Sequence, residues 1–343
     1  MAHPSGPRLV IGLIIGVVAV QALMLFAFAW PASNSGPREV PVAVAGPPEA
    51  VGQLAQTLTS VPSRDEGVPA FDVVQVQDEA AAIEAITDRD VYGAVVIGPE
   101  GPKLLVASAA SPAVAQMLRT AAGELSPGEG APAVQDVVPT TADDPTGAGL
   151  SAGVLPLVLT SAAGGLAIGL LLTSRGERLV ATAGLAVAAG LGSAALLQYG
   201  LGVAAGSYWE LAGVVALVVG AVAATVAGLG AVFGRAGAGL ALAVMILLGN
   251  PFSAAPSAPE FLPQPWGELG QFLPPGAGIT AARSVAFFDG AAIGQPLLVL
   301  AIWLVAGLLL VLLGRPGRRT ADLLEAGNVS ERGTSETRSS AGA

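Results

Sequence analysis

The 343-residue sequence has no cysteine and a single histidine, His3. Without cysteine, a disulfide framework, a thiolate nucleophile and a cysteine-ligated metal site are all excluded. His3 precedes the first apolar run, where we expect no catalytic role. No nucleophile with a base, no acid pair and no metal-ligand spacing is visible. The sequence therefore predicts a protein that is not an enzyme and needs no metal or cofactor.

Charge is also scarce: 12% of residues are charged, against about 25% in soluble domains. The long apolar runs contain no Asp, Glu, Lys, Arg or His, the residues that carry proton relays and ion coupling. An ion-driven antiporter is therefore not expected. A glycine-rich phosphate loop with a Lys-Ser/Thr pair is missing too, so any ATP hydrolysis must come from a separate subunit. The net charge of −10 predicts no nucleic-acid partner.

Hydrophobic residues make up 53% of the chain, and mean hydropathy is +0.69. A helix of about 20 residues crosses the roughly 30 Å apolar core of a bilayer. We predict a multi-pass α-helical membrane protein with six transmembrane helices, at residues 9–30, 149–173, 179–199, 211–233, 237–249 and 293–313. The first run could instead be a signal peptide cleaved near Ala27-Phe28-Ala29, but its length favours a retained anchor.

Residues 31–148 differ from the rest, with sixteen Asp/Glu against five Lys/Arg. Alternating strand and helix patterns predict a small α/β domain between the first two transmembrane helices. The expected strands are 40–45, 71–77, 92–97, 103–107 and 134–138, and the expected helices are 48–58, 78–86 and 112–122. Asp78 and Ser111 are predicted helix caps, and 123–130 is predicted to be a loop.

Basic residues predict the orientation, because they are enriched in cytoplasmic loops. Seven arginines fall on one side of a six-span arrangement, namely Arg8, Arg175, Arg178, Arg235, Arg315, Arg318 and Arg319. Only Arg283 is basic in the short loops of the other side. We therefore expect a plasma-membrane protein with residues 1–8 and a disordered tail at 315–343 in the cytoplasm, residues 31–148 outside and 149–314 in the membrane.

Glycine pairs four residues apart occur on or beside the runs, at Gly12/Gly16, Gly165/Gly169, Gly202/Gly206 and Gly230/Gly234. This spacing lets helix backbones approach closely, although a glycine-rich composition alone would also produce it. The pairs favour a packed helix bundle.

The proline-rich segment 250–290 separates the last two runs, and the fifth run is short for a full crossing. Proline frees backbone groups that protein or water must satisfy at membrane depth. We expect a partly re-entrant pair of short helices, with a surface loop carrying interfacial aromatics as the alternative. The candidate gate or groove residues are Asn250, Pro251, Pro263, Trp266, Pro274, Pro275 and Arg283.

Several strings carry a family resemblance: Arg89-Asp90-Val91-Tyr92-Gly93-Ala94, Asp144-Pro145-Thr146-Gly147, Leu155-Pro156-Leu157, Asn250-Pro251-Phe252, Pro263-Gln264-Pro265-Trp266, Leu273-Pro274-Pro275-Gly276 and Arg283-Ser284-Val285. With the order of runs, they make the chain resemble the membrane subunits of type-2 ABC exporters, in an actinobacterial permease-like branch related to the phage-infection-protein family. The resemblance covers nearly the whole chain up to Gly314.

This resemblance implies a homodimeric permease that exports a hydrophobic or amphiphilic substrate, powered by a separate ABC ATPase. Spans two and five would line the groove, and the proline-rich segment would form its outer gate. Candidate cytoplasmic docking residues are Arg175, Arg178 and Arg235. The loop at 174–178 offers little surface for an ATPase, so the alternative is a non-transporting envelope or secretion-complex protein whose external domain binds a partner.

Overall fold

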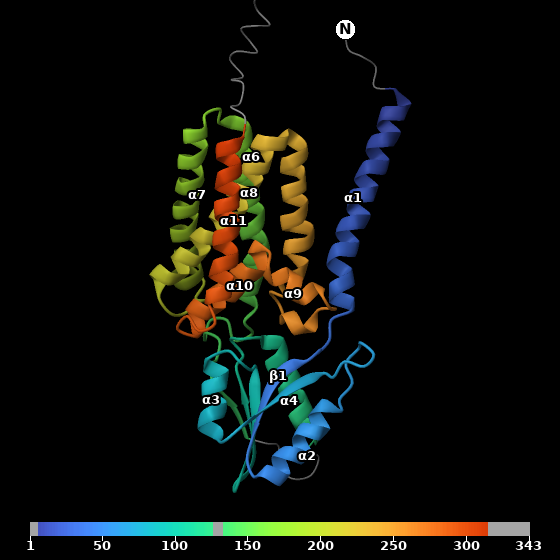
Figure 1. Cartoon of the computed structure of the whole chain (residues 1–343), viewed down its shortest axis with the longest axis vertical. Helices are drawn as coiled ribbons and strands as arrows, with labels where there is room; N and C mark the ends of the chain where they lie inside the picture. Colours follow the sequence, from blue (N-terminus) through green and yellow to red (C-terminus); the bar gives the residue numbers. More distant parts are fainter. Residues whose placement is uncertain (1–5, 126–132, 315–343) are drawn as a thin grey trace, which may run out of the picture.

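The structure, a computed structural model, describes residues 6–125 and 133–314. A sheet domain lies beneath a helical bundle along the long axis, and helix α1 (Pro7–Ser33) stands beside the bundle (Figure 1). The predicted tail at 315–343, residues 1–5 of the N-terminal segment and most of the predicted loop at 123–130 lie outside the described residues.

The bundle agrees with the prediction of a helical membrane protein. Within the described residues, five helical stretches are long and apolar enough to cross a membrane: Leu9–Ser33, Ala148–Leu171, Arg175–Gly200, Tyr208–Gly249 and Gly294–Leu313. Their elements are α5 (Ala148–Ala152), α6 (Val154–Leu171), α7 (Arg175–Ala195), the π-helical turn η1 (Leu196–Gly200), α8 (Tyr208–Ala243), the π-helical turn η2 (Val244–Gly249) and α11 (Gly294–Leu313). The count of six crossings stays a prediction.

Helix α8 and the π-helical turn η2 together contain the fourth and fifth predicted spans in one continuous stretch, Tyr208–Gly249. Gly234 breaks it, because its backbone is non-helical with φ 67° and ψ −147°. A Cβ added at Gly237 would lie 2.2 Å from the carbonyl oxygen of Leu229, so the two arms are in contact directly after the break. Glycine is needed at 234 for the positive φ and at 237 for the close approach to Leu229.

The third span starts earlier than predicted. The sequence prediction began it at Leu179, whereas α7 begins at Arg175. Ser174 accepts a hydrogen bond from the backbone N–H of Glu177, whose side chain accepts one from the N–H of Ser174, forming a capping box. The charged residues at 175–178, which were predicted to lie in a loop, therefore form the first turn of α7.

The sheet domain contains five strands in the order β2-β1-β3-β4-β5. They are β1 (Val40–Ala45), β2 (Phe71–Val76), β3 (Gly93–Gly98), β4 (Gly101–Val106) and β5 (Ala133–Asp136), with helices α2 (Pro48–Thr59), α3 (Glu79–Thr87) and α4 (Pro112–Leu125). Strand β4 runs antiparallel to β3, and the other neighbours are parallel. The predicted small α/β domain is confirmed, although α4 extends three residues past its predicted end.

Both faces of the sheet are covered, as expected for strands that are mainly parallel. Helix α3 packs on one face with Ala43, Ala94 and Leu105, while α2 and α4 pack on the other with Val42 and Leu104. The predicted caps are present: Asp78 accepts a hydrogen bond from the N–H of Ala81 and Ser111 from the N–H of Val114.

Helix α8 is the centre of the bundle, and 83% of its most apolar window is buried. Small residues allow this packing. A Cβ added at Gly165 of α6 would lie 2.5 Å from the carbonyl oxygen of Ala223, and one at Gly307 of α11 would lie 2.6 Å from the backbone carbon of Ala224. These two glycines therefore bring α6 and α11 into backbone contact with α8.

The proline-rich segment folds into short helices: η3 (Pro251–Ser253), η4 (Pro259–Phe261), α9 (Trp266–Gln271) and α10 (Pro274–Phe287). Prolines occupy the first positions of η3, η4 and α10, where a missing N–H costs nothing. Nearly all of α10 is buried among α8, α11 and the sheet domain. The segment is thus helical and packed, and is not an extended surface loop.

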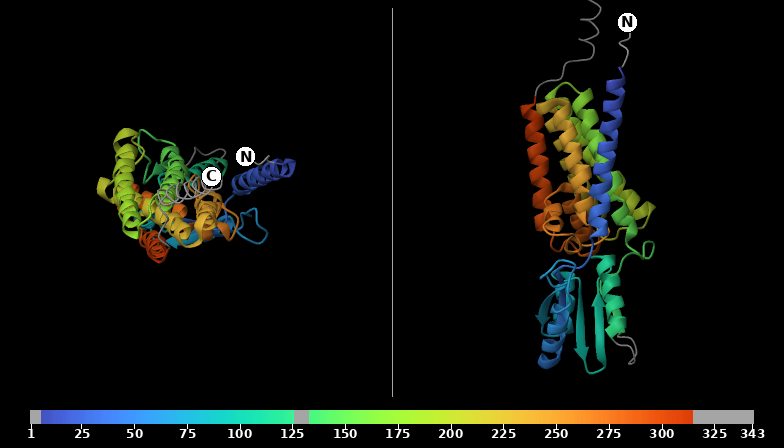
Figure 2. Two further views of the ribbon diagram at one scale, coloured as in Figure 1. Left: turned by 90° about the horizontal axis from the view of Figure 1, so that it is seen from above. Right: turned by 90° about the vertical axis from the view of Figure 1, so that its right-hand side faces the viewer.

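Helix α1 differs from every other long helix. Its most apolar window is 0% buried, and it leans away from the bundle in two views (Figures 1 and 2). Only its end near the sheet domain touches the bundle, where Trp30 packs beside Phe252 and Leu262.

Candidate functional site

An apolar groove with a volume of about 530 Å³ lies between α6 and α7. Helices α6 and α7 both pack on α8 but touch each other little, so a gap remains between them. Valines of α8 and residues of α10 close the back of this gap. The only side-chain hydroxyls on its walls are those of Thr160 and Ser193. Its chemistry is therefore suited to a hydrocarbon ligand.

One wall of the groove is a stripe along α5 and α6. Ala152, Pro156 and Thr160 recur every four residues, so they lie on one face of the helix, and all three are exposed. The hydroxyl of Thr160 donates a hydrogen bond to the carbonyl of Pro156, so a ligand need not supply an acceptor for it.

The opposite wall ends in the π-helical turn η1, where Leu196 and Leu197 face the groove. Turns of this type are uncommon and occur often at functional sites. The second π-helical turn, η2, contributes Val244, Leu247 and Leu248 to another apolar cavity of about 500 Å³. That cavity lies between α1 and the second arm of α8, so both π-helical turns border an apolar space.

Helix α10 belongs to the groove and also to the junction with the sheet domain. Pro275 and Ile279 line the groove. On the junction side, Arg89 donates to the carbonyl oxygen of Thr280 at 3.0 Å and to the hydroxyl of Ser284. The Arg89 guanidinium also lies 5.1 Å from the ring centre of Phe288, a cation–π distance. Helix α10 thus contacts the sheet domain on one side and lines the groove on the other.

A second contact joins Tyr92 of the sheet domain to Glu260 of η4, with the phenol donating at 2.9 Å. Burial raises the pKa of the Glu260 carboxyl above its ordinary value. Burial also raises the pKa of the Tyr92 phenol well above its ordinary value, and lowers that of the Arg89 guanidinium. These three side chains, each half-buried, form a polar cluster at the junction.

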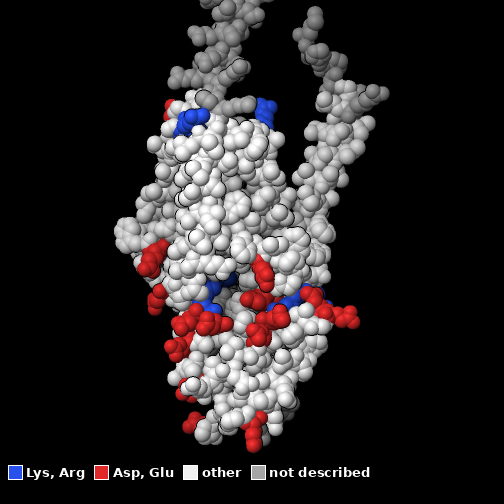
Figure 3. Space-filling model, viewed as in Figure 1, with Lys and Arg blue, Asp and Glu red and all other residues white. Residues whose placement is uncertain are grey.

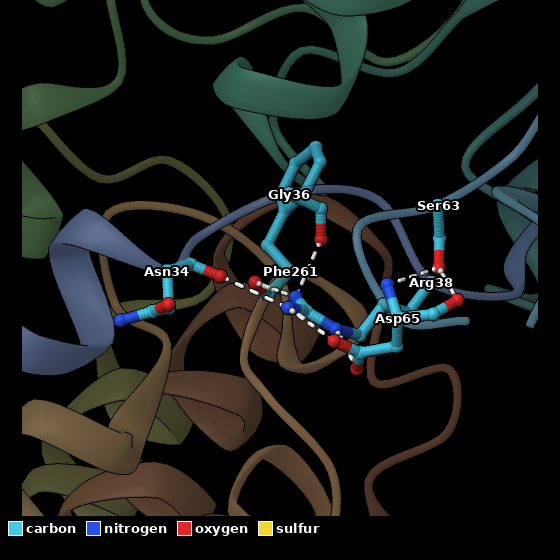
Figure 4. A network of polar contacts seen from close by, with 6 residues as sticks. All are labelled: Asn34, Gly36, Arg38, Ser63, Asp65 and Phe261. Carbon is cyan, nitrogen blue, oxygen red and sulfur yellow. Dashed lines mark hydrogen bonds and ion pairs between the residues drawn. The ribbon is translucent and has the colours of Figure 1, made fainter.

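Arg38 makes a third contact at the start of β1 (Figure 4). It is 2% exposed and donates to the carbonyl oxygens of Phe261 and Asn34 as well as to the carboxylate of Asp65. The neighbouring Arg64 donates to the carbonyl of Ser33, the last residue of α1. Arginines thus tie the sheet domain to η4 and to the end of α1.

The predicted gate residues are split among three places. Pro275 lines the groove and Pro274 starts α10 beside it. Trp266 stacks on Phe252 at 4.9 Å and lines the cavity next to α1. Arg283 lies inside the junction, where it donates to the carbonyl of Ala255 at 2.6 Å and to the hydroxyl of Ser151 at 3.2 Å.

The remaining gate candidates shape the backbone. The carbonyl oxygen of Asn250 accepts hydrogen bonds from the backbone and side chain of Ser253. Pro251 starts η3, and the carbonyl of Pro263 accepts the N–H of Trp266. The groove was predicted between spans two and five, but its walls come from spans two, three and four and from α10; residues 237–249 are not part of them.

The predicted docking arginines lie at the bundle end farthest from the sheet domain, where Figure 3 shows basic side chains. Arg178 is 3% exposed and donates to the carbonyls of Leu172 and Gly169 at the end of α6. Arg175 donates to the carbonyl of Gly314 at the end of α11. Arg235 is exposed at the Gly234 break. Two of the three therefore stabilise helix ends.

Sequence reasoning missed the pairing of Arg89 and Tyr92 with the proline-rich segment. Both residues stand in one string that carries the family resemblance, but nothing in that string indicates partners that are 168 to 195 residues away. It also missed the α7 wall, since an uncharged helix gives no indication of which face borders a gap. Comparison with family models, curated proteins and solved structures found no match.

Proposed function

We propose that the chain is a permease-like subunit of the plasma membrane that exports a hydrophobic or amphiphilic substrate, works as a homodimer and is powered by a separate ABC ATPase. The observation that carries this proposal is the apolar groove between α6 and α7, backed by α10. Uncharged spans fit an apolar cargo and do not fit ion coupling. Energy must then come from a partner.

The proposed topology has six spans, both termini in the cytoplasm and the sheet domain outside. The break at Gly234 supports two crossings within α8, because 42 helical residues would measure about 63 Å unbroken, roughly twice a bilayer core. Acidic side chains gather over the sheet domain and its junction with the bundle, where some basic ones also lie, whereas the opposite end of the bundle is mainly basic (Figure 3). This distribution supports the cytoplasmic placement of the basic end.

Single cysteines test this topology, because the chain has no native cysteine. Gln56→Cys lies on exposed α2, and Gly176→Cys lies at the opposite end with open space around the new side chain. An impermeant maleimide should label Gln56→Cys on intact cells and Gly176→Cys only after lysis. The reverse pattern would overturn the topology.

Transport is tested by co-purification of the intact protein with candidate ABC ATPases, followed by measurement of ATPase activity in nanodiscs. Binding together with stimulated hydrolysis supports the permease. If no ATPase binds and hydrolysis never responds, the permease proposal fails.

The second candidate is an envelope or secretion-complex protein that binds a partner through the sheet domain. It is favoured by the internal engagement of Arg175 and Arg178, which leaves little basic surface for an ATPase. Pull-down of partners with the full-length protein distinguishes the two candidate functions. The envelope-protein candidate predicts a partner that binds stably to the sheet domain and no stimulation of ATPase activity.

A further inference from the structure

We propose that the groove between α6 and α7 binds one acyl chain of an amine-bearing phospholipid, such as phosphatidylethanolamine, from the membrane leaflet on the side of the sheet domain. The inference rests on the proposed function, for which it names the substrate class. Its test needs no ATPase.

The depth of the groove matches one leaflet. Its α5–α6 wall runs from Gly149 to Thr160, which is about 16 Å at 1.5 Å per residue. Half of a bilayer core is about 15 Å. The Gly149 end of this wall lies at the sheet-domain end of the bundle, because α5 begins directly after the sheet domain. A chain anchored at that surface would reach the bottom of the groove near the bilayer midplane.

The groove is accessible from the lipid because its rims are exposed. Thr160 and Pro156 are exposed on α6, and Leu196 and Leu201 are 56% and 53% exposed on the other rim. Behind them, Val214 and Val218 of α8 form an apolar floor. An acyl chain can therefore enter the groove sideways from the bilayer, where it gains packing contacts with the apolar walls.

Aromatic residues mark the level of the headgroup. Tyr199 and Trp209 are 72% and 74% exposed at the end of α7 and the start of α8, and Tyr199 stacks on Tyr208 at 5.7 Å. Exposed Tyr and Trp are typical of the membrane–water interface. This level coincides with Leu201 at the mouth of the groove.

Charge at the mouth selects the headgroup. The carboxylate of Asp143 lies against Gly202, next to Leu201, and is exposed. Within residues 6–125 and 133–314 no Lys or Arg lies within ion-pair distance of it. The walls carry no Lys or Arg, and the nearby Arg283 is committed to Ser151 and Ala255. An ammonium headgroup complements this mouth, whereas an anionic one is repelled.

The probe is phosphatidylethanolamine that carries a diazirine in one acyl chain, and the comparison lipid is phosphatidylglycerol with the same chain. Each is added to phosphatidylcholine nanodiscs that hold the full-length protein. After illumination, labelled peptides are quantified by mass spectrometry. We expect labelling of 149–160 and 193–201 to exceed that of the exposed α11 face about fivefold, which corresponds to about 1 kcal/mol. The ethanolamine lipid should label these peptides more than the glycerol lipid.

Matched variants test the groove and its mouth separately. Thr160→Trp and, from the other wall, Ser193→Trp should fill the groove and reduce labelling to the α11 level, while Leu159→Trp, exposed outside the groove, should leave it unchanged. Asp143→Asn should remove the headgroup preference, and the exposed Asp72→Asn should not.

Labelling that is even over all lipid-facing helices, or that survives both tryptophans, would overturn the groove as a lipid site. Equal labelling by the two lipids would overturn the headgroup assignment. Failure to find an ATPase would instead remove the proposed function and leave lipid binding in place.

Discussion

Helices α1 and α6 are alike in composition and opposite in surroundings. Both are apolar, with no charged residue at 9–30 or in α6, and both have two glycines four residues apart, Gly12/Gly16 and Gly165/Gly169. A Cβ added at Gly165 would collide with the backbone of Ala223, whereas one at Gly12 or Gly16 would meet nothing within 4 Å. The same spacing therefore marks a helix contact in one place and an open face in the other.

The difference shows how the two helices are held. Helix α6 is fixed by backbone contact with α8 and by Arg178 at its last turn. Helix α1 is held only at its end, through Trp30 and the Arg64–Ser33 hydrogen bond, with a cavity of about 500 Å³ beside it. Its open face fits the second copy expected of a homodimer.

The largest predicted effect is a valine at each glycine. Gly165→Val should lower the free energy of unfolding by about 3 kcal/mol, because the contact with Ala223 has no room for a side chain. Gly12→Val should change it by less than about 0.5 kcal/mol. Unfolding by SDS in mixed micelles measures both. Equal effects would mean that α1 is packed as closely as α6.

A smaller effect is expected at two of the arginines that connect the sheet domain to the helices, Arg89 and Arg64. Arg89→Ala removes two hydrogen bonds and a ring contact at α10, which should cost about 2 kcal/mol. Arg64→Ala removes one exposed hydrogen bond to α1 and should cost less than about 0.5 kcal/mol. Hydrogen exchange of residues 280–290 should rise in Arg89→Ala alone. A similar rise in Arg64→Ala would contradict this.

These contacts separate what the sequence could predict from what it could not. The strands, the caps at Asp78 and Ser111 and the apolar runs follow from local pattern, since periodicity and capping depend on nearby residues. Arg89 meets Thr280 only after the chain has folded, so no local signal reveals the contact. The groove is equally hidden, because it exists where α6 and α7 fail to touch.

The third prediction concerns the arginines at the opposite end. Arg178→Ala should cost about 1.5 kcal/mol, because the carbonyls of Leu172 and Gly169 lose a buried charged donor. Arg235→Ala should have no measurable effect on unfolding, so Arg235→Glu is the clean test of ATPase docking. We expect Arg235→Glu to weaken co-purification with the ATPase. If it does not, and Arg178→Ala abolishes co-purification while the protein stays as stable as the wild type, then Arg178 and not Arg235 is the docking residue.

The smallest predicted effect is the pH dependence of stability, which should come from the polar junction and not from the apolar α1 contact. The folded-state pKa of Glu260 is raised by burial, so the native protein holds the proton more tightly than the unfolded chain. Stability from this group is therefore present below the ordinary carboxyl pKa and is lost as pH rises through the raised value. The phenol of Tyr92 and the guanidinium of Arg89 face this carboxyl and limit the loss.

Glu260→Gln keeps an acceptor for Tyr92 but cannot ionise. The decline in unfolding midpoint from acidic to neutral pH should be shallower in this variant than in the wild type, and Glu66→Gln, in an exposed loop, should keep the wild-type slope. Trp30→Ala, at the nonpolar α1 contact, should keep the wild-type slope, because the Phe252 and Leu262 side chains that it packs beside do not titrate. An unchanged slope in Glu260→Gln would show that the junction is not the pH-sensitive contact.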